Sequence, residues 1–257
     1  MSGRAARRGI VLALALSFCA VRFFFTWLAA RLRGRQVTQQ QRAEWMHFCG
    51  LMVLKSIGIH YRVEGKVPSG AVLIAANHLS YLDIVIFAAA VPSLFVAKDE
   101  IARWPAFGTL SRLGGTIYVD RESRLSAWDA AETMALRLAE NVPVLFFPES
   151  TSTDGRDVLR FHSTLFDSAV LSGLPVVPAA VFYEPFGAGI VERDLCWFGD
   201  ESFLPHLKKV LEVADFRAVV RFGEPEIFPD RRTAAWRSHD AVARMRGTYE
   251  MEVVKNA

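Results

Sequence analysis

Cysteine is scarce in this chain of 257 residues, and its three cysteines are scattered. Cys19, Cys49 and Cys196 do not have the spacing of metal ligands, so we predict no metal site, no disulfide framework and a reducing compartment. The sequence also contains no H-E-x-x-H motif and no G-x-S-x-G motif. It therefore gives no pattern for a zinc protease or for the nucleophile elbow of a serine hydrolase.

Acidic residues are absent from residues 1–35, which contain seven arginines. The rest of the chain holds 23 basic and 27 acidic residues, a charge of about −4. The net charge of +3 therefore comes from the N-terminal segment. A nucleic-acid-binding domain needs a basic face, so this distribution argues against nucleic acid as a partner.

Residues 9–30 are almost wholly apolar and have the length of a membrane-spanning helix. Arginines flank both ends, which gives only a weak preference for one orientation. The run is long for a signal peptide, and Arg31-Leu32-Arg33 is a poor cleavage context. Arg22, inside the run, fits a helix that lies shallowly or inserts partway. We expect membrane attachment, whether the helix spans the bilayer or lies on it.

A second apolar helix is expected at residues 44–57. It either packs on the first helix, dips into the membrane interface or is an ordinary core helix. We therefore divide the chain into a membrane anchor with an apolar helix pair, residues 1–58, and an α/β domain, residues 59–257.

From residue 59 onward, short apolar runs alternate with segments of helical periodicity. This alternation predicts an α/β fold with a mixed sheet flanked by helices, preceded by the N-terminal membrane-associated helical segment. The expected strands are 61–65, 71–76, 94–97, 115–121, 142–147, 175–182 and 216–222, and the expected helices are 81–90, 104–113, 124–140, 164–172 and 241–251.

Asn77 and His78 follow the apolar strand 71–76 directly, at the strand end where α/β sheets carry reactive groups. Asp83 lies five residues after the histidine, in the first turn of the next helix, from which its side chain can point back to the imidazole. A histidine held by a carboxylate has the parts of a general base. The same residues have a structural interpretation, since Ser80 and Asp83 resemble a capping box and a first-turn carboxylate suits the helix dipole.

Three further blocks each lie on or at the end of an expected strand. Residues 115–121 end in Arg121, residues 147–155 carry Glu149 and several hydroxyls, and residues 176–181 contain Pro178. Taken singly, they read as a turn, a loop cap and an edge strand. Only their order along the chain indicates a function.

This order of blocks resembles the glycerolipid acyltransferase family, which includes the lysophosphatidate acyltransferases. The family pattern is an N-H-x-x-x-x-D block, a strand ending in arginine, an F-P-E-G-T-R block and a V-x-P block, and the resemblance covers residues 59–185. The apolar N-terminal anchor and the helix after it are similar to bacterial members. The resemblance implies a bacterial inner-membrane enzyme with its catalytic domain on the cytoplasmic side.

The resemblance also implies roles for individual residues. His78 would deprotonate the hydroxyl of a lysolipid, which then attacks the thioester of an acyl carrier protein or acyl-CoA, and Asp83 would orient His78. The strand of Pro178 would help to shape the acyl or acceptor pocket. No cofactor or metal is implied. The residues expected to bind substrate are Asn77, Arg121, Glu149, Ser150, Thr151 and Ser152.

The third block departs from the family pattern at two positions. Ser150 replaces the usual glycine, and Ser152 replaces an arginine that can clamp a phosphate with two hydrogen bonds. Its loss argues against a phosphate-bearing acceptor, although Arg121, Arg156 or Arg160 can compensate.

The segments 151–155 and 160–166 look most like the lyso-ornithine lipid O-acyltransferase branch, whose acceptor carries an amine and no phosphate. Glu149, Asp154 or Asp157 would meet that amine. The alternatives are a 1-acyl-sn-glycerol-3-phosphate acyltransferase, a hydrolase that uses the same His–Asp pair on water, and a non-catalytic membrane scaffold.

Overall fold

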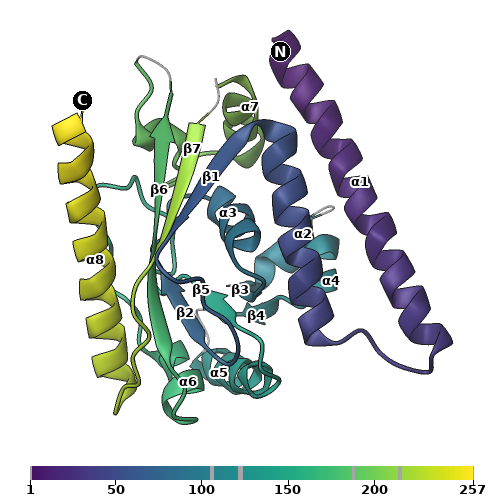
Figure 1. Ribbon diagram of the computed structural model, residues 1–257, viewed down its shortest axis with the longest axis vertical. Helices are drawn as coiled ribbons and strands as arrows, with labels where there is room; N and C mark the ends of the chain where they lie inside the picture. The colour runs from purple at the N-terminus through teal and green to yellow at the C-terminus, as the bar shows by residue number, and fades with distance from the viewer. Residues whose placement is uncertain (1, 105–106, 121–123, 187–188, 214–215, 257) are drawn as a thin grey trace.

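The computed structural model describes residues 2–104, 107–120, 124–186, 189–213 and 216–256. Within these residues, helices cover both faces of one seven-stranded sheet (Figure 1). The strand order across the sheet is β1-β7-β6-β2-β5-β3-β4. The strands are β1 (Ile59–Glu64), β2 (Leu73–Ala76), β3 (Leu94–Lys98), β4 (Ile117–Val119), β5 (Val144–Phe146), β6 (Val176–Pro185) and β7 (Phe216–Phe222).

The sheet is mixed, as the sequence predicts. Strands β6, β2, β5, β3 and β4 run parallel to one another, and β1 is parallel to β7. The β6–β7 pair is antiparallel. Strand β6 lies between β7 and β2, so the edge-strand interpretation of the Pro178 block is wrong. Pro178 fits this central strand because it precedes the β6–β7 ladder, which starts at Ala179.

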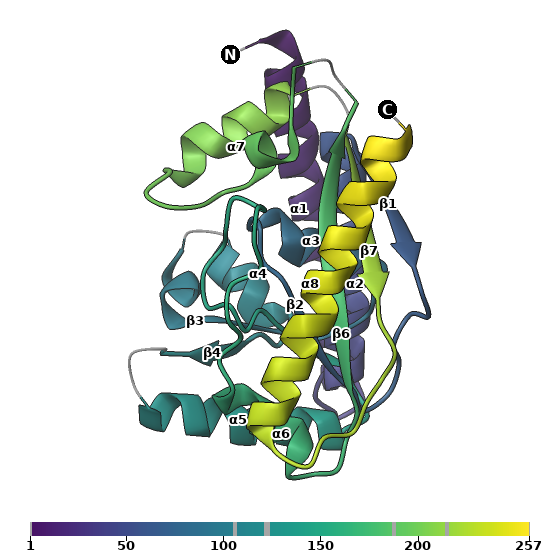
Figure 2. The same ribbon diagram turned by 90° about the vertical axis from the view of Figure 1, so that its left-hand side faces the viewer.

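The helices form two layers with separate apolar cores. One layer contains α2, α3 and α7, and the other contains α5, α6 and α8. Figure 2 shows α8 lying across strands β6 and β7. The helices are α1 (Gly3–Leu32), α2 (Gln39–Ile57), α3 (Leu82–Ala90), α4 (Phe107–Leu113), α5 (Arg124–Ala139), α6 (Asp167–Val170), α7 (Phe203–Glu212) and α8 (Arg231–Asn256), with 3-10 helices η1 (Asp99–Arg103), η2 (Thr164–Phe166) and η3 (Glu192–Leu195).

The last helix is longer than the sequence analysis expected, because it begins at Arg231 rather than near residue 241. The side chain of Asp230 accepts the backbone N–H groups of Arg232 and Thr233 at 2.8 and 3.0 Å, as an N-terminal cap does. The Thr233 hydroxyl also donates to Asp230, and this bond, together with the backbone bonds, lowers the pKa of Asp230. Helix α7 was not expected from the sequence, and the helix expected at 164–172 is a 3-10 turn followed by the short α6.

Helices α1 and α2 form an antiparallel pair. The Phe23 and Trp45 rings meet edge to face, with centroids 5.0 Å apart, and the Trp45 indole donates to the carbonyl of Cys19 at 2.8 Å. The Arg22 guanidinium lies 4.1 Å from the centre of the Phe48 ring. Arg22 is therefore placed beside α2, where its charge has an aromatic face as a partner.

Helix α2 also packs directly against α3. A Cβ atom on Gly50 would lie 2.5 Å from the backbone nitrogen of Ala89, so only glycine allows α2 and α3 to approach this closely. Leu54 and Ile57 belong to the same apolar core as β1 and α3. Helix α2 is thus a core helix that packs on α1 as well. The domain boundary at residue 58 stays a prediction.

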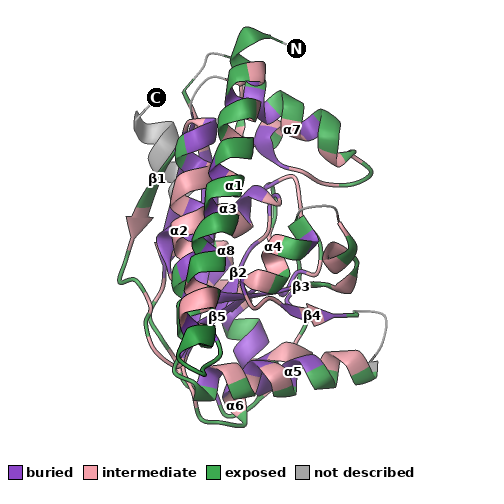
Figure 3. Cartoon of the chain, turned by 90° about the vertical axis from the view of Figure 1, so that its right-hand side faces the viewer, coloured by how far each residue is buried: buried purple, intermediate pink, exposed green. Residues whose placement is uncertain are grey.

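The outer face of α1 is apolar and exposed (Figure 3). In the described part of the chain, α1 is the one helix long and apolar enough to cross a membrane. Its N-terminal end contacts α7, where Arg8 donates to the carbonyl of Val213 at 2.7 Å. The large apolar side chains exposed on this face include Ile10, Leu14, Phe18, Phe25 and Leu32.

Candidate active site

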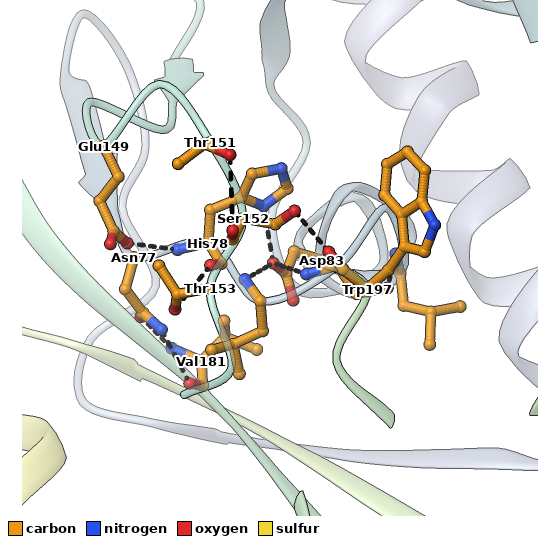
Figure 4. A network of polar contacts seen from close by, with 12 residues as sticks. Asn77, His78, Asp83, Glu149, Thr151, Ser152, Thr153, Val181 and Trp197 are labelled. Carbon is orange, nitrogen blue, oxygen red and sulfur yellow. Dashed lines mark hydrogen bonds and ion pairs between the residues drawn. The ribbon is translucent and has the colours of Figure 1, made fainter. Parts of the chain in front are cut away.

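His78 lies in the turn between β2 and α3, at the carboxyl end of the sheet (Figure 4). Strand β2 is buried along its whole length between β5 and β6, so the turn that follows it is fixed by strands on both sides. This is the position predicted from the sequence. The His78 side chain keeps 17% of its surface exposed and can be reached by a substrate.

The carboxylate of Asp83 is fully buried and points back to His78, as expected. The distance from His78 Nδ1 to Asp83 Oδ2 is 2.8 Å. The same oxygen accepts the backbone N–H groups of Leu79 and Ser80 at 2.6 and 3.0 Å. Asp83 therefore stabilises the turn and holds the imidazole at the same time. Only half of the expected capping box forms, because the Ser80 hydroxyl accepts the backbone N–H of Leu82, at 3.3 Å, and not that of Asp83.

This geometry assigns the proton of neutral His78 to Nδ1, since the carboxylate can only accept. Nε2 then carries the free lone pair, and no hydrogen bond joins it to another described residue. The ring of Phe147 stacks on the imidazole with centroids 4.1 Å apart and an interplanar angle of 15°. The histidine is thus held by a carboxylate at one nitrogen and by an aromatic face, with its other nitrogen available.

Glu149 supports the same turn from the end of β5. One carboxylate oxygen accepts the His78 backbone N–H at 2.7 Å, and the other accepts the Leu159 N–H at 2.7 Å. Only 3% of the residue is exposed, and this burial raises the pKa of Glu149 to about 7. Both oxygens are committed to the backbone, so the contacts of Glu149 are those of a supporting residue. Its expected role in binding an acceptor stays a prediction.

The side-chain amide of Asn77 hydrogen-bonds to the backbone of β6 as a neighbouring strand would. Its Oδ1 accepts the N–H of Val181 at 2.8 Å, and its Nδ2 donates to the carbonyl of Val181 at 3.3 Å. The residue is buried. Asn77 therefore ties the His78 turn to the centre of β6, and a direct contact with substrate stays a prediction.

The loop after Glu149 wraps around His78 (Figure 4). Ser150 has a φ of +65°, a left-handed conformation that favours glycine, which is the family residue at this position. Ser152 donates its hydroxyl to the carbonyl of Trp197, and the Thr153 N–H donates to the carbonyl of His78 at 2.9 Å. Thr151 is exposed.

The predicted substrate-binding residues thus have different surroundings. Ser150, Thr151 and Ser152 lie in the loop beside His78, whereas Asn77 and Glu149 hold the backbone of the turn. Arg121 lies outside the described residues. The binding role of each residue stays a prediction.

Two sets of residues near the site were not found from the sequence. Trp197 donates its backbone N–H to the carbonyl of Leu79 at 2.8 Å. Arg246, from α8, is buried and pairs with Glu192, 2.8 Å away, while also donating to the carbonyls of Gly155 and Val181. An arginine in a helical tail carries no local signal for such a contact. Its partners come from distant parts of the sequence.

An apolar cavity lies between α1, α2, α3, α4 and α7 and extends to the first turn of α3. Leu12, Val53, Val85 and Phe203 are among its lining residues, and Tyr81 and Leu82 place its wall within four residues of His78 in the sequence. Pro178 lines a different cavity, between the sheet and α8. Among the described residues, no group of three or more His, Cys, Asp or Glu side chains is arranged to hold a metal ion.

The class of this protein follows from the known proteins that its sequence matches. Residues 58–182 match the family model described as Acyltransferase. A lyso-ornithine lipid O-acyltransferase of Rhodobacter capsulatus is 37% identical to this chain over 190 residues, which cover 70% of this chain and 67% of that protein. A 1-acyl-sn-glycerol-3-phosphate acyltransferase of Neisseria gonorrhoeae is 36% identical over 182 residues, which cover 69% and 71% of the two proteins.

The chain therefore belongs to the acyltransferase family, as its four blocks predicted. The crystal structure of the 1-acyl-sn-glycerophosphate acyltransferase of Thermotoga maritima has the same fold, with a TM-score of 0.65. That match covers 96% of this chain and 98% of the other, at 19% identity. Relatives of both kinds considered in the sequence analysis are thus similar to this chain, and the enzyme class predicted from the sequence is confirmed.

Proposed function

We propose that this chain is a membrane-bound O-acyltransferase that moves a fatty acyl group from an acyl carrier protein or CoA thioester to the hydroxyl of a lysolipid. The observation that supports this function best is the pairing of His78 with the buried Asp83, 2.8 Å apart. In the proposed reaction, Nε2 of His78 removes the hydroxyl proton as the oxygen attacks the thioester carbonyl. The carbon–oxygen bond forms, the carbon–sulfur bond breaks, and the proton passes to the departing thiolate.

Asp83 serves this reaction by fixing which nitrogen of His78 is the base. Because Nδ1 donates to the carboxylate, the lone pair of the neutral ring is on Nε2. The negative charge of Asp83 also stabilises the imidazolium that forms when His78 takes the proton. No covalent acyl-enzyme is needed.

The apolar cavity beside α3 supports a lipid substrate. Its walls come from five helices and from strand β3, and its lining side chains are mainly aliphatic or aromatic. Burying a methylene group stabilises a complex by about 0.8 kcal/mol, so a fatty acyl chain gains affinity from every carbon that the cavity takes up. We place an acyl chain in this cavity, with its reacting end near the first turn of α3.

Lyso-ornithine lipid is the acceptor that we favour. Ser152, at the position of the phosphate-clamping arginine, is already bonded to the carbonyl of Trp197. Glu149 is occupied by backbone N–H groups, which leaves Asp154 and the exposed Asp157 as the carboxylates of this loop that can meet an amine. Asp154 is half-buried and lies 3.4 Å from both Arg156 and Arg193.

The alternative acceptor is 1-acyl-sn-glycerol-3-phosphate. The same arginines favour it, because Arg156 and Arg193 can offer guanidinium groups to a phosphate in place of the missing arginine at position 152. Arg193 comes from η3, outside the four blocks. The acceptor that is used therefore depends on whether Asp154 or its two arginine partners contact the head group.

We place the enzyme at the bacterial inner membrane, with the catalytic domain facing the cytoplasm and residues 1–58 as the anchoring segment. The exposed apolar face of α1 and the absence of acids from residues 1–35 support this location. Membrane lipids would then be both the surroundings and the source of the acceptor.

The test is an acyl-transfer assay of the purified, detergent-solubilised protein with acyl carrier protein and CoA thioesters. Lyso-ornithine lipid and 1-acyl-sn-glycerol-3-phosphate are supplied side by side, and we expect faster transfer to the ornithine lipid. The His78→Ala variant should lose a factor of about 10²–10⁴ in rate. His60→Ala, which alters an exposed histidine on β1, is the matched control and should keep full activity.

A hydrolase using the same His–Asp pair gives a different result in this assay. Thioester consumption at the full rate without any lysolipid would rule out the transferase proposal. Unchanged transfer by His78→Ala would show that the base lies elsewhere.

A further inference from the structure

A buried tyrosine completes the hydrogen bonding of Asp83. The hydroxyl of Tyr183 donates to Asp83 Oδ1, while Oδ2 accepts from His78 and from two backbone N–H groups. Tyr183 keeps 2% of its surface exposed and Asp83 none. The two oxygens of the carboxylate thus have separate tasks, one toward the imidazole and its turn and the other toward the phenol.

The position of Tyr183 is fixed by contacts on both sides. It lies two residues after Val181 on β6, so the two side chains share a face of the sheet, and Val181 is the residue to which Asn77 ties the His78 turn. The Tyr183 N–H donates to Glu192 at 2.8 Å, and Glu192 is paired with Arg246. Its ring also packs against Phe216, with centroids 5.7 Å apart. The phenol therefore reaches Asp83 from a rigid strand.

Such a contact changes the strength of Asp83 as a partner for His78. A hydroxyl that donates to a buried carboxylate takes up part of its negative charge, and the carboxylate then attracts the imidazolium less strongly. Burial and the nearby Asp83 charge raise the pKa of Tyr183 well above its usual range, so the phenol stays neutral and keeps its proton to donate.

We infer that Tyr183 is a positioning residue of the acyl-transfer reaction, which holds Asp83 Oδ1 and thereby sets the basicity and orientation of His78. The inference rests on the proposed role of His78 as the base. It adds a third member, supplied by β6, to a pair formed by the turn after β2 and the first turn of α3.

The test is the Tyr183→Phe variant, which removes one oxygen atom and keeps the ring. Without the phenol hydroxyl, the charge of Asp83 acts on the imidazole alone, so we expect the pKa of His78 to rise by on the order of one unit. Histidine-selective NMR titration of the full-length protein measures this directly. The His78 resonance is identified by its absence from His78→Ala. The acidic limb of the kcat/KM profile should move to higher pH in parallel.

Kinetics give a second reading of the same variant. Loss of a residue that orients a reactive group costs about 10- to 100-fold, and we expect this loss in kcat with KM within twofold of the wild-type value. Tyr118→Phe on β4 is the matched control, because it removes a hydroxyl that is hydrogen-bonded to Ser111 of α4 and leaves Asp83 untouched. The control should change neither the titration of His78 nor kcat.

A second experiment applies if Tyr183→Phe does not fold. Replacing all tyrosines of the wild-type protein with 3-fluorotyrosine strengthens the phenol as a donor and keeps its shape. The pKa of His78 should then fall, the opposite direction from the deletion. An unmoved His78 titration in Tyr183→Phe, or in the fluorinated protein when the variant does not fold, would overturn the inference.

The NMR reading also separates this inference from the proposed function. Because it needs no substrate, a shifted titration in a protein without acyl-transfer activity would refute the proposed function and leave the Tyr183–Asp83–His78 linkage established. Active enzyme that depends on His78 but is indifferent to Tyr183→Phe would refute the linkage alone.

Discussion

The carboxylate of Glu149 accepts the backbone N–H of His78 at a distance of 2.7 Å. This contact joins the end of β5 to the turn after β2, and a second bond from the Leu159 N–H completes it. A buried carboxylate that holds only backbone N–H groups pays a desolvation cost, which is why the pKa of Glu149 is raised to about 7. This contact therefore affects the stability of the protein, the pH dependence of that stability and the position of His78.

The first prediction concerns the pH dependence of stability. The pKa of Glu149 is about 7 in the folded protein against 4.5 for an unperturbed glutamate, so the folded state holds more protons between these values. Its contribution to stability is therefore fully present below pH 4.5 and is lost as pH rises toward 7, by on the order of 3 kcal/mol.

Urea unfolding at pH 5 and pH 8 measures this effect. Glu149→Gln is the comparison, because its side chain does not titrate, and the decline in stability should be smaller in the variant than in the wild type. The variant should be less stable at both pH values, since its amide NH₂ group faces a backbone N–H donor. An equal loss of unfolding free energy between pH 5 and pH 8 in the two proteins would show that Glu149 is already ionised at pH 5.

The second prediction concerns Asp83. In Asp83→Asn the amide can present its NH₂ group to Nδ1, which favours the tautomer with the proton on Nε2 and removes the base. We expect kcat to fall by about 10²–10⁴. Asp99→Asn removes an exposed carboxylate paired with Arg103 and should leave the rate unchanged. A loss of less than tenfold in Asp83→Asn would show that the carboxylate is not needed for catalysis.

The third prediction concerns the left-handed backbone at Ser150. A non-glycine residue at φ +65° costs about 1 kcal/mol, whereas glycine adopts this conformation freely. Ser150→Gly should therefore be as stable as the wild type or up to about 1 kcal/mol more stable by urea unfolding. Ser172→Gly, at a position without a positive φ, should lose stability, and the same loss at both positions would contradict the assignment.

The fourth prediction concerns the contact of α2 with α3. Gly50→Ala places a methyl group 2.5 Å from a backbone nitrogen of α3, so the helices must separate, at a cost of about 1–3 kcal/mol. Gly247→Ala in α8 has no heavy atom within 4 Å of the new methyl group and should gain up to about 1 kcal/mol from helix propensity. Thermal unfolding of the two variants in detergent should therefore shift in opposite directions.

The fifth prediction concerns acceptor choice. Ser152→Arg restores the family arginine beside His78 and breaks the bond from Ser152 to the Trp197 carbonyl. We expect the ratio of kcat/KM for 1-acyl-sn-glycerol-3-phosphate to that for lyso-ornithine lipid to rise by about tenfold, since a bidentate phosphate contact is gained. Ser152→Lys adds charge without the planar fork and should give a smaller increase. A ratio that stays constant in both variants would place the head group away from residue 152.

The sequence predicts those features of the fold that depend on neighbouring residues. Strands β2 and β6 begin as apolar runs, and their type could be predicted because burial on both faces leaves no room for polar side chains. Strand β1 differs, because it carries His60, Arg62 and Glu64 and is exposed over much of its length. The His78–Asp83 contact was also readable, since only five residues separate its partners. Helix α7 was missed because its ten residues include Pro205 and several charges, and its buried side chains pack on elements far away in the sequence.

Residues joined across long stretches of chain could not be paired from the sequence. Tyr183 lies 100 residues after Asp83, and Arg246 lies 91 residues after Gly155. Nothing near either residue indicates its partner, because their meeting depends on the order of strands in the sheet. The supporting role of Glu149 could not be predicted for the same reason. The motif identifies the residue, but it does not identify the backbone N–H groups that hydrogen-bond to its carboxylate.

The pairing of β1 with β7 sets a delay during synthesis of this protein. Glu64 and Arg221, which face each other across these strands, are 157 residues apart. At 5–20 residues per second, β1 leaves the ribosome about 8–30 s before its partner strand exists. Throughout that interval β1 lacks the strand that pairs with it in the finished sheet, and β6 lacks the neighbour on its β7 side. A chain cut short before residue 216 keeps these open edges permanently, which makes nascent and truncated copies natural substrates for chaperones and proteases.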